Sequence, residues 1–304
     1  MFPIIPANSV TAASGNDEGI FGYGNDGSYK AVTNLVSNTG VVASDQAAVT
    51  GTARQNLAGT QYGGDKGIFG FGEPGPTNVT NLVSNTGVVA SDTAGVGTAR
   101  STLAACSYGD DKGIFGFGNT GSATAVTNLV SDAGVVASDQ AATTGTARYG
   151  LSACEYGGDK GIFGFGTTYS TAGIGSITNL VSNAGVVASD QAATTGTGKM
   201  GLAACSYGGD KGIFGYGENA GGKLSETNLV SNTGVVASDT AGVGTTRQAP
   251  AACEFGGDQG IFGFGYNAAY LSVTNLVSNA GVVASDQAAT TGTGRYNLGA
   301  CSFN

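Results

Sequence analysis

Short runs of apolar residues, interrupted at every second or third position by Gly or a polar residue, recur along the chain. Residues 100–148 contain one complete unit of this pattern. The unit holds four runs: 103–108 (LAACSY), 112–118 (KGIFGFG), 126–131 (VTNLVS) and 135–138 (VVAS). Each run is bounded by Gly, Asn or Asp, as is typical of strands joined by tight turns. The unit therefore predicts a four-stranded antiparallel meander.

Alternation within the runs indicates strands and not helices. In GIFGFG we expect Phe115 and Phe117 on one face of the strand, with Ile114 and Gly116 on the other. No window shows ten residues of helical periodicity. Gly within a strand normally weakens it, but also allows two sheets to approach closely.

The same unit is repeated six times at intervals of 46 to 51 residues. The motif GIFG, followed by Tyr or Phe and Gly, begins at Gly19, Gly67, Gly113, Gly161, Gly212 and Gly260. A fixed period of this length is the signature of one supersecondary unit copied in tandem. Four strands repeated six times predict an all-β fold, a single six-bladed β-propeller over residues 17–304 with four antiparallel strands per blade. A linear stack is the alternative, although neither end of the chain resembles a cap.

The first run of each unit predicts how the ring closes. Five Cys residues occupy one equivalent position in successive units, with Thr60 in the sixth: Cys106, Cys154, Cys205, Cys253 and Cys301. The last copy, Leu298–Phe303, has no further strands of its own. We therefore expect this C-terminal strand to be the innermost strand of the first blade, residues 19–45, which leaves no open edge. Val10–Ser14 is a degenerate copy that competes for this slot, and residues 1–16 are an N-terminal arm or an extra strand.

Two resemblances follow from the repeat. The pattern R-x-x-L-A-A-C-x-Y-G-G-D-K-G-I-F-G-F-G resembles the kelch repeat over about residues 10–304. The second strand ends in Gly-aromatic-Gly where kelch has Gly-Gly, and VVAS replaces the aromatic pair near the fourth strand, so the repeat is kelch-like. The near-identical units DKGIFGFG…TNLVSNTGVVASD…GTAR…LAAC also resemble repeats in proteins of marine and cyanobacterial bacteriophages. That resemblance implies a structural protein of a virion.

Charge and composition exclude several classes of partner. The chain of 304 residues has 12 basic and 21 acidic residues, a net charge of −9. Because the basic residues are scattered through the repeats, no nucleic acid or anionic membrane is expected as a partner. No run is apolar for long enough to insert into a membrane. The start, MFPIIPANS, lacks the features of a secretory signal peptide, so we expect synthesis in the host cytoplasm. The resemblance to phage repeats implies a final place in the virion.

The residue types favour a protein that is not an enzyme. The absence of His removes Ser-His-Asp and Cys-His catalysis and the commonest metal ligand. The Cys residues lie a whole blade apart, which predicts small buried thiols and neither a metal site nor disulfides. Matches to G-x-G-x-x-G, such as residues 22–27, have no following helix to hold a pyrophosphate. We therefore expect no metal and no cofactor.

Two sets of Asp repeat in every unit. One set ends the turn after the first strand: Asp17, Asp65, Asp111, Asp159, Asp210 and Asp258. The other follows the fourth run: Asp45, Asp92, Asp139, Asp190, Asp239 and Asp286. We expect these carboxylates to bind turn amides or to pair with the repeated basic residues Arg54, Arg100, Arg148, Lys199, Arg247 and Arg295. A catalytic site normally breaks symmetry, which disfavours a paired-carboxylate hydrolase.

The six units differ most between their second and third strands. In an up-and-down meander these segments share one face of the molecule, while nearly identical turns ring the other. The candidate binding residues on these loops are Tyr29, Lys30, Tyr169, Tyr266 and Tyr270. Exposed Tyr on variable loops offers a large contact area at low entropic cost, which suits recognition. Ordinary solvated loops remain an open alternative.

Three functional hypotheses follow. The first is a non-enzymatic virion structural protein of a bacteriophage, a tail, tail-fibre or capsid-decoration component. It would dock on other virion proteins through residues 1–16 and display the propeller for assembly or host attachment. The second is a lectin-like module that binds a host-surface glycan through the Tyr-bearing loops. The third is a carboxylate-dependent glycan hydrolase or lyase.

Overall fold

The computed structural model describes residues 17–46, 51–141, 145–169, 173–192, 196–288 and 292–303. Within these ranges the fold is all-β, and every strand pairing is antiparallel. No helix in the described residues is long and apolar enough to cross a membrane.

The strands form six three-stranded sheets and one short hairpin among the described residues. The first three sheets are β20–β1–β2 (Gly299–Phe303, Glu18–Gly22, Thr33–Val36), β3–β4–β5 (Ala58–Tyr62, Lys66–Gly72, Thr77–Val83) and β6–β7–β8 (Ala104–Tyr108, Lys112–Gly116, Thr127–Val130). The next three are β9–β10–β11 (Ser152–Tyr156, Lys160–Gly164, Thr178–Val181), β12–β13–β16 (Ala203–Tyr207, Lys211–Gly215, Thr227–Val230) and β17–β18–β19 (Ala251–Phe255, Gln259–Tyr266, Tyr270–Val277). The hairpin is β14–β15 (Glu218–Asn219, Gly222–Lys223).

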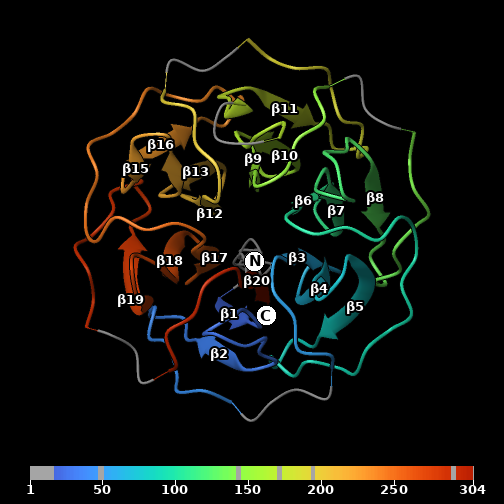
Figure 1. Ribbon diagram of the computed structural model, residues 1–304, viewed down its shortest axis with the longest axis horizontal. Helices are drawn as coiled ribbons and strands as arrows, with labels where there is room; N and C mark the ends of the chain where they lie inside the picture. The colour runs from blue at the N-terminus through green and yellow to red at the C-terminus, as the bar shows by residue number, and fades with distance from the viewer. Residues whose placement is uncertain are drawn as a thin grey trace, which may run out of the picture.

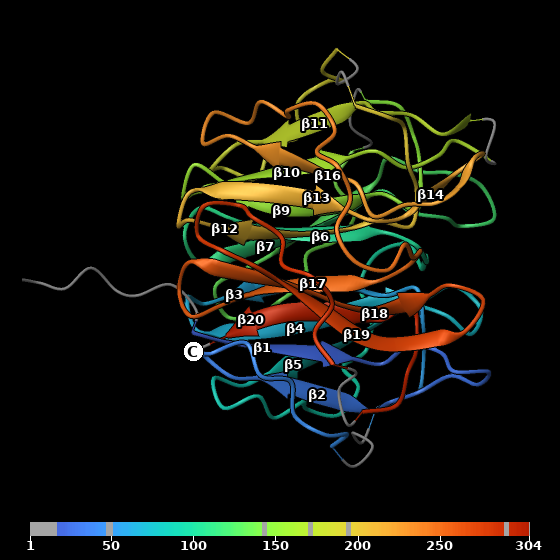
Figure 2. The same ribbon diagram turned by 90° about the vertical axis from the view of Figure 1, so that its left-hand side faces the viewer.

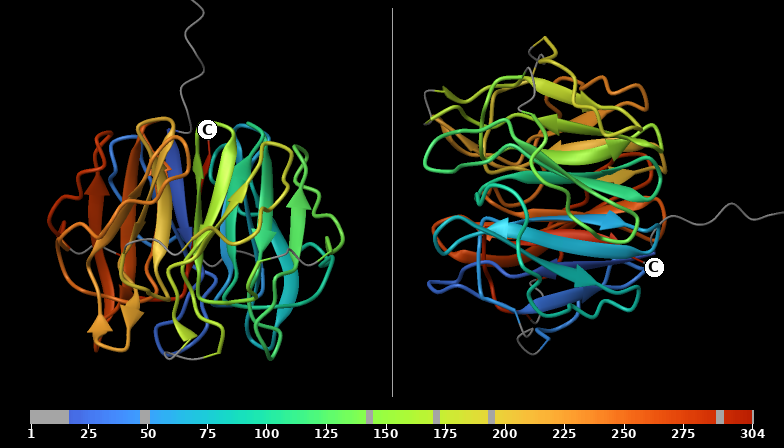
Figure 3. Two further views of the ribbon diagram at one scale, coloured as in Figure 1. Left: turned by 90° about the horizontal axis from the view of Figure 1, so that it is seen from above. Right: turned by 90° about the vertical axis from the view of Figure 1, so that its right-hand side faces the viewer.

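The six sheets are arranged around a common axis, with the first strand of each sheet innermost (Figure 1). The inner strands contact one another in the order β3, β6, β9, β12, β17, β20 and back to β3. The strands run roughly along this axis in the side views (Figure 2 and Figure 3). The turns after the first and third strands of each sheet therefore lie on one face, which we call the turn face. The segments between second and third strands lie on the opposite, loop face.

The last strand completes the first sheet, as expected from the sequence. β20 pairs along its whole length with β1, with Cys301 opposite Ile20 and Phe303 opposite Glu18. The competing copy, Val10–Ser14, and the predicted arm at residues 1–16 lie outside the described residues.

The prediction of four strands per sheet is wrong, because the fourth run makes only isolated bridges. In the first sheet these bridges join Val36 to Val42 and Thr33 to Gln46. The four residues of β2 therefore lie opposite five residues of the next run, 42–46. The buried side chain of Asn34 fills the resulting break. Its Nδ2 atom donates to the carbonyl oxygen of Ala43 at 3.0 Å. This side-chain bond replaces a rung of the ladder and prevents a regular strand.

The predicted alternation also fails at the second aromatic residue of GIFGFG. Phe115 packs on Phe71 of the preceding sheet, with ring centroids 5.1 Å apart. Phe117 instead packs on Phe163 of the following sheet, the side to which Ile114 also points. The cause is the backbone of Phe117, whose φ of 61° ends the extended conformation. Each sheet therefore contributes aromatic rings to both of its neighbours.

Candidate functional site

A repeated polar cluster, which we call the clasp, connects each third strand to the segment before an inner strand. In the first sheet, the amide of Thr293 donates to both carboxylate oxygens of Asp45, at 3.2 and 3.0 Å, and its hydroxyl donates at 2.6 Å. Asn34 Nδ2 donates to the same carboxylate at 2.9 Å. The clasp therefore joins two parts of the chain that are far apart in sequence.

A buried guanidinium completes this clasp. Arg295 Nη2 donates to Asn34 Oδ1 at 2.6 Å, and its Nη1 lies 3.7 Å from Asp45. The guanidinium carbon lies 4.4 Å from the ring centroid of Phe264, in the neighbouring sheet. The Thr–Asp pair recurs as Thr52–Asp92, Thr98–Asp139, Thr146–Asp190, Thr197–Asp239 and Thr245–Asp286. The basic residues that accompany these pairs are Arg54, Arg100, Arg148, Lys199 and Arg247.

The clasp shifts the pKa values of its charged groups. Partial burial acts to raise the pKa of Asp45, but the hydrogen bonds from Thr293 and Asn34 and the charge of Arg295 hold it below its usual value. Burial lowers the pKa of Arg295 to about 10, against the attraction of Asp45. Both groups are therefore charged at neutral pH, and the clasp is an ion pair supported by hydrogen bonds.

The other Asp set does not pair with the repeated Arg residues, because it lies on the turn face. Asp65 pairs with the adjacent Lys66, and Asn85 Nδ2 donates to it at 3.4 Å. The same Asp–Lys pair recurs as Asp111–Lys112, Asp159–Lys160 and Asp210–Lys211. Asp258 accepts from Asn279 Nδ2, and the backbone carbonyl of Asp17 accepts from the amide of Gly256. These residues stabilise turns.

Three Tyr rings form a cluster on the loop face, which we call the tyrosine patch. Tyr266 and Tyr270 lie directly opposite each other across the β18–β19 hairpin, with ring centroids 5.6 Å apart. Tyr296, from the segment before β20, lies 5.5 Å from Tyr266. It stacks on Tyr270 at 5.7 Å, with an angle of 25° between the ring planes. The side chain of Tyr270 is 41% exposed, so the patch is accessible from solvent.

Polar groups from neighbouring sheets surround the patch. Lys223 Nζ, on the β14–β15 hairpin, lies 5.3 Å from the centroid of the Tyr266 ring. Asn25 makes backbone bridges to both Tyr296 and Tyr29, and thereby connects the patch to the first sheet. Burial raises the pKa of Tyr296, and the nearby Tyr270, Tyr266 and Glu73 add to this shift. The phenol group of Tyr296 is therefore a neutral hydrogen-bonding group.

The five candidate residues from the sequence divide between this patch and other places. Tyr266 and Tyr270 come together in it, and Tyr29 lies beside it, 39% exposed. Lys30 pairs with Asp26, at 3.1 Å. Tyr169 is 69% exposed and belongs to a different loop, where its carbonyl oxygen accepts from Tyr149.

Sequence reasoning missed Tyr296 and Lys223. Tyr296 follows the repeated Arg, at a position that is otherwise Gln, Ser, Tyr, Met and Gln in the five other units. This variation was a usable signal. Lys223 had no comparable signal, because only the folding of its hairpin brings it near a ring of another sheet.

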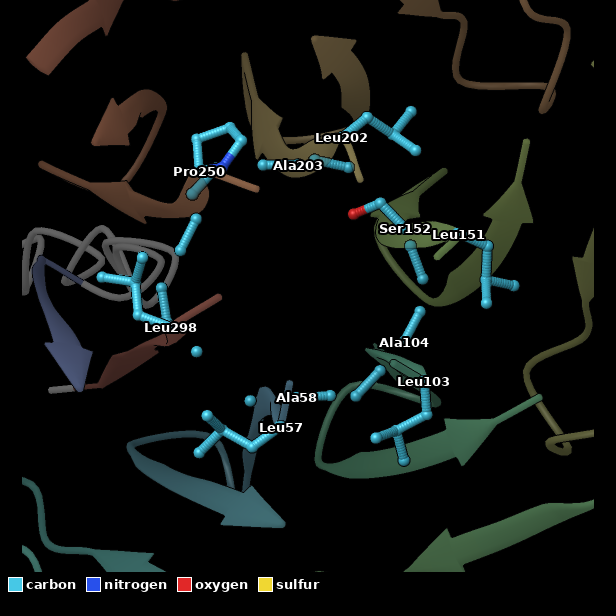
Figure 4. Close-up of a pocket in the computed structure, with 18 residues that line it drawn as sticks. Leu57, Ala58, Leu103, Ala104, Leu151, Ser152, Leu202, Ala203, Pro250 and Leu298 are labelled. Carbon is cyan, nitrogen blue, oxygen red and sulfur yellow. The ribbon is translucent and has the colours of Figure 1, made fainter. Parts of the chain in front are cut away.

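A narrow channel follows the axis between the inner strands. Its middle part holds a cavity of about 100 Å³ lined mostly by residues with apolar side chains, and Figure 4 shows the side chains of successive inner strands surrounding it. Ala58, Ala104 and Ala203 are among the small residues that leave this space. Leu and Pro side chains surround the channel toward the loop face: Leu57, Leu103, Leu151, Leu202, Pro250 and Leu298.

The end of the channel at the turn face is polar. Its cavity of about 60 Å³ is lined by the residue that follows the Cys or Thr60 position in each inner strand: Gln61, Ser107, Glu155, Ser206, Glu254 and Ser302. These residues all carry side-chain oxygen atoms, yet they differ between sheets. The variable residue is the middle position of the Cys-x-aromatic motif in each inner strand, and it was not among the site residues predicted from the sequence.

The two Glu residues at this end are in different surroundings. Glu155 accepts from Ser107 Oγ and, at 3.3 Å, from Gln61 Nε2. No described residue donates a hydrogen bond to the carboxylate of Glu254. Burial raises the pKa of Glu155 to about 7 and that of Glu254 to about 8, where the charge of Glu155 adds to the effect.

Comparisons with known proteins do not assign the chain to a family. No protein-family model matches it, and no curated protein does either. Within the described ranges, no three His, Cys, Asp or Glu side chains gather as potential metal ligands. The functional assignment therefore depends on the geometry of the tyrosine patch and the channel.

Proposed function

We propose that the six sheets form a kelch-like six-bladed β-propeller and that its loop face is a binding surface. The cyclic contacts of the inner strands and the pairing of β20 with β1 support this architecture. The C-terminal strand then closes the ring. Differences between units are concentrated in the loops, which suits a rigid scaffold that presents variable contacts.

We propose further that the protein is a non-enzymatic structural protein of a bacteriophage virion that binds a host-surface glycan. The tyrosine patch is the observation that supports binding of a glycan. Pyranose rings have apolar C–H faces that pack on aromatic rings, while their hydroxyl groups need polar partners. Tyr270 and Tyr296 offer such faces, and Lys223 offers a donor beside them.

The virion location is supported by the likeness of the repeats to those of marine and cyanobacterial phage proteins. Residues 1–16 would dock on other virion proteins, and the many copies in a particle would strengthen weak contacts through avidity. We favour a binding role over a glycan hydrolase or lyase, because both repeated Asp sets include ion pairs with Lys or Arg.

Glycan binding is tested with the purified protein on a glycan array. We expect at least one glycan to bind and the variants Tyr270→Ala and Tyr296→Ala to lose about tenfold or more in affinity, since each removes a stacking surface. Tyr169→Ala is the matched control, because Tyr169 is also exposed on a variable loop but lies outside the patch. Binding that persists in both patch variants would contradict the assignment of the site.

The virion location is tested by deleting residues 1–9 in the phage genome. We expect folded protein to accumulate in infected cells while purified particles lack it. A variant with Tyr169→Ala should still be incorporated. Normal incorporation of the deletion variant would count against docking through this segment.

A further inference from the structure

Lys223, beside the tyrosine patch, differs from the other Lys residues in lacking an ion pair. The six others each pair with an Asp: Lys30, Lys66, Lys112, Lys160, Lys199 and Lys211. Lys223 makes no ion pair with any residue that the structure describes, although the chain has 21 acidic and only 12 basic residues. An ammonium group without such a partner beside a binding surface is available to an anionic ligand.

The β14–β15 hairpin holds this ammonium group against the patch. The hairpin belongs to the part of the chain between β13 and β16, and it projects at the loop face (Figure 2). Lys223 Nζ lies 5.3 Å from the centroid of the Tyr266 ring. The ring centroids of Tyr270 and Tyr296 lie 5.6 and 5.5 Å from the same centroid. A sugar residue that packs on Tyr270 or Tyr296 would therefore lie within one aromatic ring of the cation.

The carboxylates near the patch make its two sides electrostatically different. Glu218 lies directly opposite Lys223 across the hairpin, yet the two side chains form no ion pair. Glu73 follows β4, on the other side of the patch in the order of sheets around the axis, and its charge acts on Tyr296. The Glu73 carboxylate also accepts a hydrogen bond from Ser101 Oγ at 3.0 Å. The side of the patch at Lys223 therefore attracts an anion, and the side at Glu73 repels one.

We propose that the glycan bound at the tyrosine patch is acidic, and that Lys223 binds the carboxylate or sulfate group of the sugar residue that packs on the Tyr rings. This inference rests on the proposed glycan-binding function and adds the chemical class of the ligand. When one face of a pyranose packs on an aromatic ring, its substituents project from the edge of the sugar. An ammonium group beside the aromatic ring can then donate a charge-assisted hydrogen bond to an anionic substituent. A neutral sugar would leave Lys223 without a partner of opposite charge.

The experiment compares acidic glycans with their neutral counterparts on one array: sialyllactose with lactose, galacturonan oligomers with their methyl esters, and sulfated with unsulfated galactan oligomers. We expect the full chain to bind at least one acidic glycan about tenfold or more tightly than its neutral counterpart. Carboxylate and sulfate glycans among the bound ones identify which anion is recognised. Lys223→Gln should remove the preference, and Lys223→Arg should keep it. Lys112→Gln is the matched control, because it makes the same change in net charge on the turn face. It should bind like the wild type.

The outcomes separate this inference from the proposed function. Neutral glycans that bind, lose binding in Tyr270→Ala and keep it in Lys223→Gln would overturn the acidic assignment while glycan binding stands. Absence of binding to every glycan would overturn both.

A salt titration of the wild type covers the case in which the Lys223 variants unfold. Between about 50 mM and about 0.5 M NaCl, the affinity for the acidic glycan should fall while that for its neutral counterpart stays constant, because salt screens an exposed ion pair. An affinity for the acidic glycan that does not change with salt would also overturn the inference.

Discussion

At the scale of single residues, the clasp explains why several polar side chains are repeated without a catalytic role. Asn34 donates to a backbone carbonyl and to Asp45, and accepts from Arg295. Its side chain therefore interrupts the sheet ladder and also fixes a buried cation. An Asp in place of Asn34 would lack these donors, and a Leu would leave the guanidinium of Arg295 without this partner.

The clasp predicts how stability depends on acid. The folded-state pKa lies below the ordinary Asp value of 3.8 in each clasp Asp: Asp45, Asp92, Asp139, Asp190, Asp239 and Asp286. Stabilisation from such a group is complete above its unfolded-state pKa and is lost as the pH falls through the lower folded-state value. The free energy of unfolding in urea should therefore fall steeply below about pH 4, because six groups become protonated together.

The variant Asp45→Asn tests this origin. It should be less stable than the wild type at neutral pH and should lose less stability on acidification, since one of the six groups no longer titrates. Asp132→Asn, in an exposed turn, should keep the acid dependence of the wild type. An unchanged acid profile in Asp45→Asn would contradict the role of the clasp.

At the scale of the strands, Gly and Cys are matched across the interfaces between sheets. The first Gly of each GIFG motif lies against the Cys or Thr of the preceding inner strand. A Cβ atom at Gly260 would lie 2.6 Å from Cys205 Sγ and 3.2 Å from the carbonyl oxygen of Ser206. This contact explains both the repeated Gly and the small, buried thiol, and it places neighbouring sheets close together.

A double-mutant cycle tests this match. Gly260→Ala should destabilise the protein by about 1–3 kcal/mol, because the new methyl group overpacks the interface. Cys205→Ala removes the Sγ atom, so the double variant should be more stable than the sum of the two single effects predicts. Urea unfolding gives the four free energies. Strict additivity would show that the two residues do not share this contact.

At the scale of the whole molecule, the repeat made the antiparallel all-β fold and the place of the last strand predictable. The period identified the unit, and the position of Cys301 showed that residues 298–303 were an inner strand without its own sheet. The fourth strand and the direction of Phe117 were not predictable in this way. A hydrogen bond from the Asn34 side chain interrupts the fourth strand, and a positive φ at Phe117 turns its ring to the other face of the sheet. Both features depend on contacts with other segments.

The candidate sites were predictable only in part, for a related reason. Tyr266 and Tyr270 belong to one hairpin and could be identified from the variable loops. Tyr296, Lys223 and the two Glu residues come from separate units, so only the arrangement around the axis brings them to their sites (Figure 1). For Tyr296 and the two Glu residues, departures from the repeat at otherwise equivalent positions were the signal, and at Glu155 and Glu254 they occur beside the Cys positions that align the units.

The pairing of β20 with β1 has a consequence for biosynthesis. On the ribosome, residues 18–36 emerge early, yet the strand that completes their sheet is translated only after all the other sheets. The nascent chain therefore carries an open hydrogen-bonding edge on β1 during most of its elongation. The sheet that is made first is the last to be finished.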